Sequence, residues 1–264
     1  MLSGASYLNA WNSDKVGRRK STAVIYWIAL SWSESDALVV MKKYFGILML
    51  LLVALTSRAD LTNETVSVTN NAAITDGNPV GISSTLNVSG MSGSATNITV
   101  NLDITGGFSG DLYAYLVSPT GTMVVLVNRT GMGSGNNFGY ADAGFNVTFD
   151  SASANNIHNY QSGSYTLNGS GQLTGTWATD SRAIDPRSAP SLFDASPAGN
   201  TLSNYYGSNP NGVWTLFLAD LSGGGQSTLV SWGLSVVTVP EPQTWTLFGG
   251  GLAACWMLIR RRRN

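Results

Sequence analysis

The chain has 264 residues, a formal net charge of −1 and only 11% charged residues, a length compatible with one or two domains. This average hides an acidic stretch, because residues 60–239 contain eleven Asp or Glu residues, three Arg and no Lys, and so carry a net charge near −8. An acidic domain gains nothing from the release of phosphate counterions, which excludes nucleic acid as a natural partner.

Residues 41–59 have the pattern of a secretory signal peptide. Lys42 and Lys43 supply the basic start, residues 44–55 form an apolar core, and Ala59 is the small residue before a predicted cut at Asp60. Signal peptides stand at the N-terminus, so we expect residues 1–40 to be an upstream extension without a fold of its own. The alternative is a long N-terminal region ahead of a signal anchor.

Residues 60–239 show almost no helical periodicity and instead alternate between apolar and polar positions. Strands are predicted at residues 61–69, 81–88, 98–105, 112–116, 123–127, 145–149, 214–218 and 232–236. Residues 123–127 are continuously apolar, as in a strand that is buried on both faces. Eight or nine strands of this kind predict an all-β sandwich.

A tight antiparallel hairpin is predicted at residues 118–121, which read Ser118, Pro119, Thr120 and Gly121. Proline favours the second position of a type I turn and glycine the fourth.

The middle of the chain, residues 151–211, is less regular, and long connections often carry the function of a sandwich. Within it, Tyr205 and Tyr206 could stack against sugar rings, although packing inside the fold is the simpler interpretation.

Two blocks, residues 106–126 and 211–236, carry a family resemblance. Their motif residues are Gly110, Asp111, Leu112, Ser118, Pro119, Gly121, Trp214, Asp220 and Trp232. In this pattern the chain resembles the P domain that follows the catalytic domain of subtilisin-like proprotein convertases. One departure is the insertion of three residues between Gly225 and Leu229. The resemblance covers residues 98–237 and implies a galactose-binding-like jelly-roll β-sandwich, to which residues 60–97 would add the N-terminal strands.

Asp111 and Asp220 are predicted to stand at strand ends. They either accept backbone N–H groups in turns or bind Ca²⁺, which prefers hard oxygen ligands. Asp142 and Asp150 are weaker candidates of the same kind. No Asp-x-Asp-x-Asp loop is present, so no metal ligand is assigned.

The C-terminal segment, residues 238–264, contains the triplet Pro240, Glu241 and Pro242, an apolar stretch predicted as a membrane helix at residues 245–259, and the cluster Arg260, Arg261, Arg262 and Arg263. It resembles the PEP-CTERM sorting signal of exosortase systems in Gram-negative bacteria. The arginines favour the cytoplasmic side of the membrane, so the domain would face outward. A helix of this length spans only about 23 to 26 Å, which suits a temporary anchor.

The resemblance implies that an exosortase cuts near Pro242 after transient anchoring in the inner membrane, and delivers the domain to the outer surface or the extracellular matrix. The alternative is a plain single-span anchor.

Catalysis is not expected from the residue inventory. His158 is the only histidine and Cys255, in the tail, the only cysteine. A serine triad needs a histidine base beside a nucleophile and an oxyanion hole, and no nucleophile motif is near His158. We expect His158 to be a surface or supporting polar residue.

The sequence therefore predicts a non-catalytic, exported cell-surface or extracellular-matrix protein of an exopolysaccharide-producing Gram-negative bacterium. Signal peptidase and exosortase would process it, and extracellular polysaccharide is a candidate partner. One alternative is an accessory P domain for a separate subtilisin-like serine endopeptidase; another is a glycan-binding adhesin.

Overall fold

The computed structural model describes residues 61–239, and in addition residues 249–251, 256 and 260. Residues 59–242 form one compact unit, and residues 1–58 with 243–264 are a separate one. The predicted upstream extension and signal peptide, residues 1–59, lie outside the described residues.

Nine strands make up the described domain. They are β1 (Thr62–Ile74), β2 (Asn78–Val88), β3 (Ser94–Gly106), β4 (Leu112–Val117), β5 (Met123–Asn128), β6 (Gly144–Phe149), β7 (Leu173–Trp177), β8 (Gly212–Asp220) and β9 (Ser227–Val239). Within this domain, short 3₁₀ helices occur in the connections, as η1 (Ser109–Asp111), η2 (Ile157–Ser162), η3 (Pro190–Leu192) and η4 (Leu202–Tyr205).

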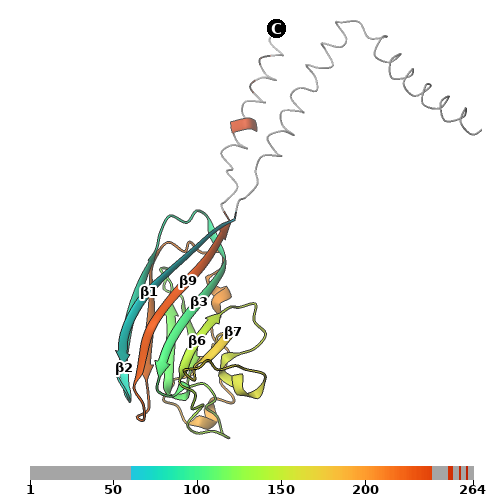
Figure 1. The fold of residues 1–264 in the computed structure, drawn as a ribbon. Helices are drawn as coiled ribbons and strands as arrows, with labels where there is room; N and C mark the ends of the chain where they lie inside the picture. Colours follow the sequence, from blue (N-terminus) through green and yellow to red (C-terminus); the bar gives the residue numbers. More distant parts are fainter. Residues whose placement is uncertain (1–60, 240–248, 252–255, 257–259, 261–264) are drawn as a thin grey trace, which may run out of the picture. The chain divides into compact units, whose positions relative to one another are not determined.

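The strands form two sheets, so the predicted all-β sandwich is confirmed. A five-stranded sheet has the order β1-β9-β3-β6-β7, and a four-stranded sheet the order β2-β8-β4-β5. All neighbours are antiparallel except β6 and β7, which run parallel. The eight strands other than β7 have the order of a jelly roll, and β7 is added at one edge. Figure 1 shows β1, β9, β3 and β6 side by side.

The core lies between the two inner sheet faces and follows the alternation read from the sequence. Along β3, the residues Ile98, Val100, Leu102 and Ile104 are at most 1% exposed. Each sheet also adds a large aromatic side chain, since Trp214 of β8 is fully buried and Trp232 of β9 is 1% exposed. Because side chains of a strand alternate between its faces, the intervening Ser, Thr and Asn residues face outward.

The predicted hairpin joins β4 to β5. The amide of Gly121 donates to the carbonyl oxygen of Ser118 at 2.9 Å, which closes the turn. Gly121 has φ of +85°, a conformation that favours glycine.

Strand β5 is buried on both faces, as its apolar run predicted: Val124, Leu126 and Val127 are fully buried. It is also an edge strand, and its free edge is covered by the long middle connection. The amides of Asp180 and Ser181 donate to the carbonyl oxygens of Leu126 and Val125, at 2.9 and 3.1 Å.

Strand β7 and the full length of β1 were not predicted. The pattern predicted a first strand ending at Thr69, but β1 continues to Ile74 after a register shift between Thr69 and Ala72. Such a bulge breaks the period of two in the sequence. Strand β7 contains Gly175, which has low strand propensity, and depends on a parallel partner distant in the chain.

We predict that Trp232→Ala lowers the free energy of unfolding by about 3 to 5 kcal/mol, because it removes a large buried side chain. It also removes the hydrogen bond from Trp232 Nε1 to Ser84 Oγ, which measures 2.8 Å. Urea denaturation followed by circular dichroism measures the change. Val213→Ala, at a position 54% exposed, is the control and should change stability by less than about 0.5 kcal/mol. Equal effects of the two substitutions would contradict this account of the core.

Candidate functional site

Most of the family-motif residues lie in two groups at opposite ends of β4, whereas Trp232 lies on β9 of the other sheet. Gly110, Asp111 and Leu112 lie where η1 leads into β4, and Leu112 pairs with Asp220 at the end of β8. Ser118, Pro119 and Gly121 lie in the hairpin beyond the other end of β4, about 17 Å away by strand rise. The motif therefore does not form one site. Gly110 has a packing reason, because a Cβ there would lie 2.5 Å from the carbonyl oxygen of Phe138.

Arg129, which immediately follows β5, is held against Asp111. Its Nη2 lies 3.4 Å from Asp111 Oδ1 and donates to Ser222 Oγ at 2.6 Å, and its Nε donates to the carbonyl oxygen of Gly110 at 3.1 Å. Burial raises the pKa of Asp111, and the charge of Arg129 opposes that shift. The sequence did not single out Arg129, because its partner in space is 18 residues away in the chain.

Asp220 is fully buried at the same end of the sandwich. Its Oδ1 accepts the amide of Ser222 at 3.3 Å, and its Oδ2 accepts from Ser227 Oγ at 3.4 Å. Burial raises the pKa of Asp220 to about 6, and the negative charges of Asp111 and Asp76 act in the same direction.

This end of the sandwich thus gathers acidic groups, but their arrangement does not define a metal site. Across residues 61–239, no group of three or more His, Cys, Asp or Glu side chains is placed to hold an ion. Asp111 is paired with a guanidinium, and Asp220 accepts hydrogen bonds in a turn. Calcium binding at these residues stays a prediction.

The two weaker calcium candidates have partners of their own. Asp142 Oδ2 accepts from Tyr160 Oη at 2.7 Å and from Gln161 Nε2 at 2.8 Å. Asp150 Oδ1 accepts the amide of Ala152 at 2.8 Å, a turn contact.

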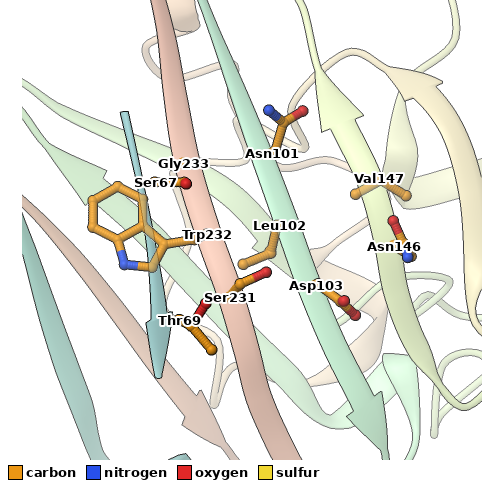
Figure 2. A pocket seen from close by; sticks show the side chains of 10 residues that line it. All are labelled: Ser67, Thr69, Asn101, Leu102, Asp103, Asn146, Val147, Ser231, Trp232 and Gly233. Atoms are coloured by element: carbon orange, nitrogen blue, oxygen red, sulfur yellow. The ribbon is translucent and has the colours of Figure 1, made fainter. Parts of the chain in front are cut away.

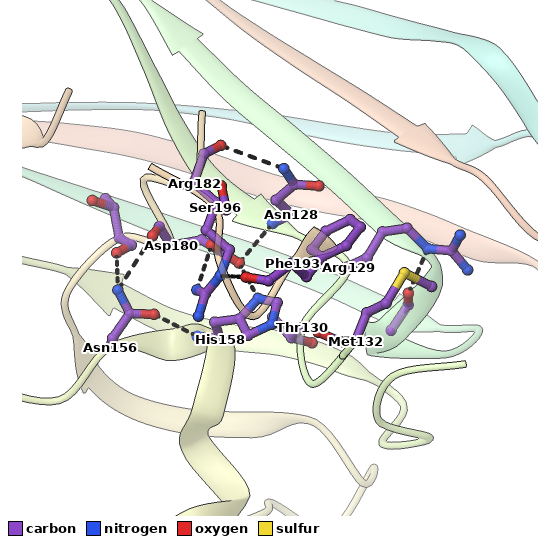
Figure 3. Close-up of polar contacts among 12 residues, drawn as sticks. Asn128, Arg129, Thr130, Met132, Asn156, His158, Asp180, Arg182, Phe193 and Ser196 are labelled. Atoms are coloured by element: carbon purple, nitrogen blue, oxygen red, sulfur yellow. Dashed lines mark hydrogen bonds and ion pairs between the residues drawn. The ribbon is translucent and has the colours of Figure 1, made fainter. Parts of the chain in front are cut away.

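A buried polar network surrounds Asp180 in the middle connection (Figure 3). The fully buried carboxylate lies 2.7 Å from His158 Nδ1 and 3.0 Å from Arg182 Nη1, and it accepts the amide of Asn128 at 3.0 Å. Because a buried charge is costly unless it is paired, these contacts explain how Asp180 is tolerated. They also tie residues 156–182 to the end of β5.

Of the two placements expected for His158, the surface one was wrong, because the residue is 2% exposed and its ring stacks against Phe193. Its polar contacts inside the fold are compatible with the other, a supporting polar residue. Its Nε2 lies 2.9 Å from the carbonyl oxygen of Met132, which can only accept a hydrogen bond. With Nδ1 against the Asp180 carboxylate, both ring nitrogens are occupied. The ring therefore has no free nitrogen to take a proton from a nucleophile.

Tyr205 cannot stack against a sugar, because it is 1% exposed, packs edge-on against Trp214 and donates to the carbonyl oxygen of Leu116 at 2.7 Å. Tyr206 is half-buried and donates to Asn97 Oδ1 at 2.8 Å. Packing was the simpler interpretation of this pair in the sequence, and the contacts agree with it.

The predicted processing sites fall outside the described residues. These are Ala59 and Asp60, the triplet Pro240, Glu241 and Pro242, and Arg261, Arg262 and Arg263. Most of the predicted membrane helix, residues 245–259, is outside them too. Within the parts of the chain that the structure describes, no helix is both long and apolar enough to cross a bilayer. Arg260 is described, and its guanidinium carbon lies 4.9 Å from the centre of the Trp256 ring.

We predict that Asp220→Asn makes the stability of the protein less sensitive to pH between about 4 and 6.5. The pKa of Asp220 is raised from 3.8 to about 6, so the folded state holds this proton more tightly than the unfolded state does. The free energy of unfolding then falls as the pH rises through this range, by up to about 3 kcal/mol. The asparagine side chain does not ionise, so this part of the slope should disappear in the variant.

Urea denaturation at a series of pH values measures the slope. Asp185→Asn is the matched control, because Asp185 is exposed and its pKa is lowered instead. An unchanged slope in Asp220→Asn would contradict the assignment.

Two parts of this chain match known protein families. A family model of the proprotein convertase P-domain matches residues 95–178, and a model of the PEP-CTERM protein-sorting motif matches residues 238–263. No protein with a curated description matches the chain.

Among solved structures, the chain is similar to a serine protease of Aeromonas sobria. In the crystal structure of its complex with a chaperone, the identity is 17%, the match covers 73% of this chain and 29% of that chain, and the TM-score is 0.37. In the structure of the protease itself, the identity is 16%, the coverage is 71% and 29%, and the TM-score is 0.36. This chain thus spans less than a third of the length of those proteins.

The P-domain match begins in β3 and ends just after β7, so it includes Asp111 and the hairpin but not Trp214, Asp220 or Trp232. The two family models confirm both resemblances found in the sequence: residues 95–178 match the proprotein convertase P-domain, and residues 238–263 match the PEP-CTERM protein-sorting motif.

Proposed function

We propose that this chain is a non-catalytic, exported protein of the cell surface or extracellular matrix, in which a P-domain-like sandwich serves as a binding or structural module. The observation that carries the proposal is the PEP-CTERM motif at residues 238–263, which marks an exported, sorted protein and implies processing by an exosortase. The second processing enzyme would be signal peptidase, acting between Ala59 and Asp60.

The geometry of His158 supports the absence of catalysis. A general base must have a ring nitrogen within hydrogen-bond reach of the proton that it removes. Both nitrogens of His158 are bound inside the fold, to Asp180 and to the carbonyl oxygen of Met132. In this proposal the His158–Asp180 pair holds the middle connection in place.

Charge and composition support an extracellular role among neutral polymers. Residues 60–239 carry no Lys and a net charge near −8, which disfavours anionic partners. Extracellular polysaccharide is the partner that we favour, and transient contact with the inner membrane would precede release.

A second candidate function, docking on a separate subtilisin-like protease, has one observation in its favour. The outer face of the four-stranded sheet carries an aromatic cluster, in which Tyr115 and Phe217 stack at 4.8 Å and Tyr113 lies 5.8 Å from Tyr115. Exposed apolar residues extend this face, with Val213 54% and Met123 44% exposed. Aromatic residues and methionine are enriched in protein interfaces.

We predict that the mature protein recovered from the outside of the producing cells begins at Asp60 and ends near residue 242. Intact mass spectrometry measures both ends at once. Replacement of Glu241 by Ala should leave the C-terminal segment attached, since the triplet is the recognition motif of the sorting signal. A wild-type species that retains Arg263 would contradict the sorting proposal.

We also predict that the purified full chain does not hydrolyse casein or fluorogenic peptides. His158→Ala should lower the free energy of unfolding by several kcal/mol, since it removes one of the partners of the buried Asp180 carboxylate. Activity in the wild-type protein that His158→Ala abolishes, at a temperature where circular dichroism shows the variant to be folded, would overturn the non-catalytic assignment.

A further inference from the structure

A shallow hollow lies on the outer face of the five-stranded sheet, away from every site described above. Its volume is about 210 Å³, and the residues that shape it are Ser67, Asn101, Asp103, Asn146, Ser231 and Gly233 (Figure 2). They come from four neighbouring strands, β1, β9, β3 and β6. This volume is below the roughly 300 to 1,000 Å³ of pockets for drug-sized ligands, and it suits a single small ring.

Strand register assembles the hollow from residues that are far apart in the chain. Two adjacent cross-strand rows run over it: Ser67, Gly233, Asn101 and Thr148 form one, and Thr69, Ser231, Asp103 and Asn146 form the other. The residues between the rows, among them Leu102, Val147 and Trp232, are buried toward the core. Both rows therefore face outward.

Gly233 forms the floor of the hollow. It occupies an outward position on β9, between β1 and β3, where a side chain would otherwise stand. A Cβ at this position would lie 2.7 Å from the carbonyl oxygen of Val66 and 2.9 Å from Ser67 Cβ. The close approach of β1 thus requires glycine here, and the missing side chain leaves the depression.

The polar groups around the floor include both donors and acceptors, and two of them are fixed by neighbours. Thr148 Oγ1 donates to Asn101 Oδ1 at 2.7 Å, which leaves the Nδ2 group as a donor. Gln172 Nε2 donates to Asp103 Oδ1 at 2.7 Å, which leaves Oδ2 as an acceptor. Asn146 is exposed on the same face and can both donate and accept.

The charges around the hollow limit the class of ligand. Asp103 is the only ionisable residue in the two rows, and Arg129, Arg182 and Arg187 all lie outside the strands that form them. An anion would meet no positive charge from these rows, and a metal ion would meet a single carboxylate. An apolar ligand would meet mostly amides and hydroxyls. An uncharged ligand rich in hydroxyl groups matches, because each hydroxyl both donates and accepts.

The short side chains favour binding of such a ligand for a second reason. Ser, Thr and Asn lose less rotamer entropy when a ligand fixes them than Lys, Arg, Gln or Glu would. Strands also hold their side chains more rigidly than loops do, so the polar groups are already placed.

We propose that this face binds an uncharged polysaccharide, with one sugar unit in the hollow at Gly233 and adjoining units along the two cross-strand rows. The inference rests on the proposed function, because an exported surface protein is one that meets such polymers, and it adds the site and the ligand class. It also assigns the ligand to the polar sheet face and not to the aromatic face around Phe217.

Affinity gel electrophoresis tests the ligand class. The full chain is purified in a zwitterionic detergent without a sugar headgroup, and is run through gels that contain dextran or mannan as neutral polymers, or alginate as an anionic one. We expect at least one neutral polymer to retard the protein and alginate to have no effect.

Two matched pairs of substitutions test the site. Ser67→Arg places a long side chain over the hollow and should weaken retardation at least tenfold in apparent Kd. Ser83→Arg makes the same change at an exposed serine of β2, beside Phe217 on the opposite sheet, and should have no effect. Asn146→Ala removes one amide and should weaken binding about two- to tenfold, whereas Asn87→Ala on β2 should not. Thermal unfolding confirms that each variant is folded.

The outcomes separate this inference from the proposed function. Binding that survives Ser67→Arg but is lost in Ser83→Arg would place the ligand on the aromatic face and overturn the inference. A change of oligomeric state in Ser67→Arg without loss of polymer binding would make this face a contact between copies and overturn it too. Failure of both neutral polymers to bind would also overturn it. In each case the intact-mass test of export and sorting still decides the proposed function by itself.

Discussion

The pairing of β9 on both of its edges is the constraint on which the domain depends. β9 lies between β1 and β3, and its register with them extends from Ser227 to Val239. Its inward residues, Leu229, Trp232, Leu234 and Val236, form part of the buried core. Its outward Gly233 permits the close approach of β1 and shapes the polar hollow. One strand thus sets the core, the sheet order and the proposed binding face.

The domain is built without a disulfide, since the only cysteine of the chain, Cys255, belongs to the C-terminal segment, residues 238–264. Hydrophobic burial between the sheets stabilises the sandwich itself. The middle connection adds buried apolar side chains to this core, among them Ile157 and Tyr160. It is also held by the polar network at Asp180, which joins His158, Arg182 and the amide of Asn128. The histidine that a search for catalysis would single out is therefore explained by its contacts inside the fold.

The sequence predicted the sandwich well because period-two alternation depends only on neighbouring residues. It could not predict β7, the bulge in β1 or the burial of His158, since each depends on contacts between distant segments. The hollow illustrates this limit most clearly: Ser67, Asn101, Asn146 and Gly233 are ordinary positions in the sequence until strand register places them on one face. The division of most motif residues between the two ends of β4 likewise required the topology.

The position of β9 has a consequence for how the protein comes to fold. A strand that comes last in the domain must insert between two strands that were made much earlier, so its native contacts span most of the domain's length. Topologies with such long-range contacts fold slowly. Until residues 227–239 have left the cytoplasm, the edges of β1 and β3 that pair with β9 have no partner. Completion of export, more than the start of it, would then be the event that commits this chain to its native state.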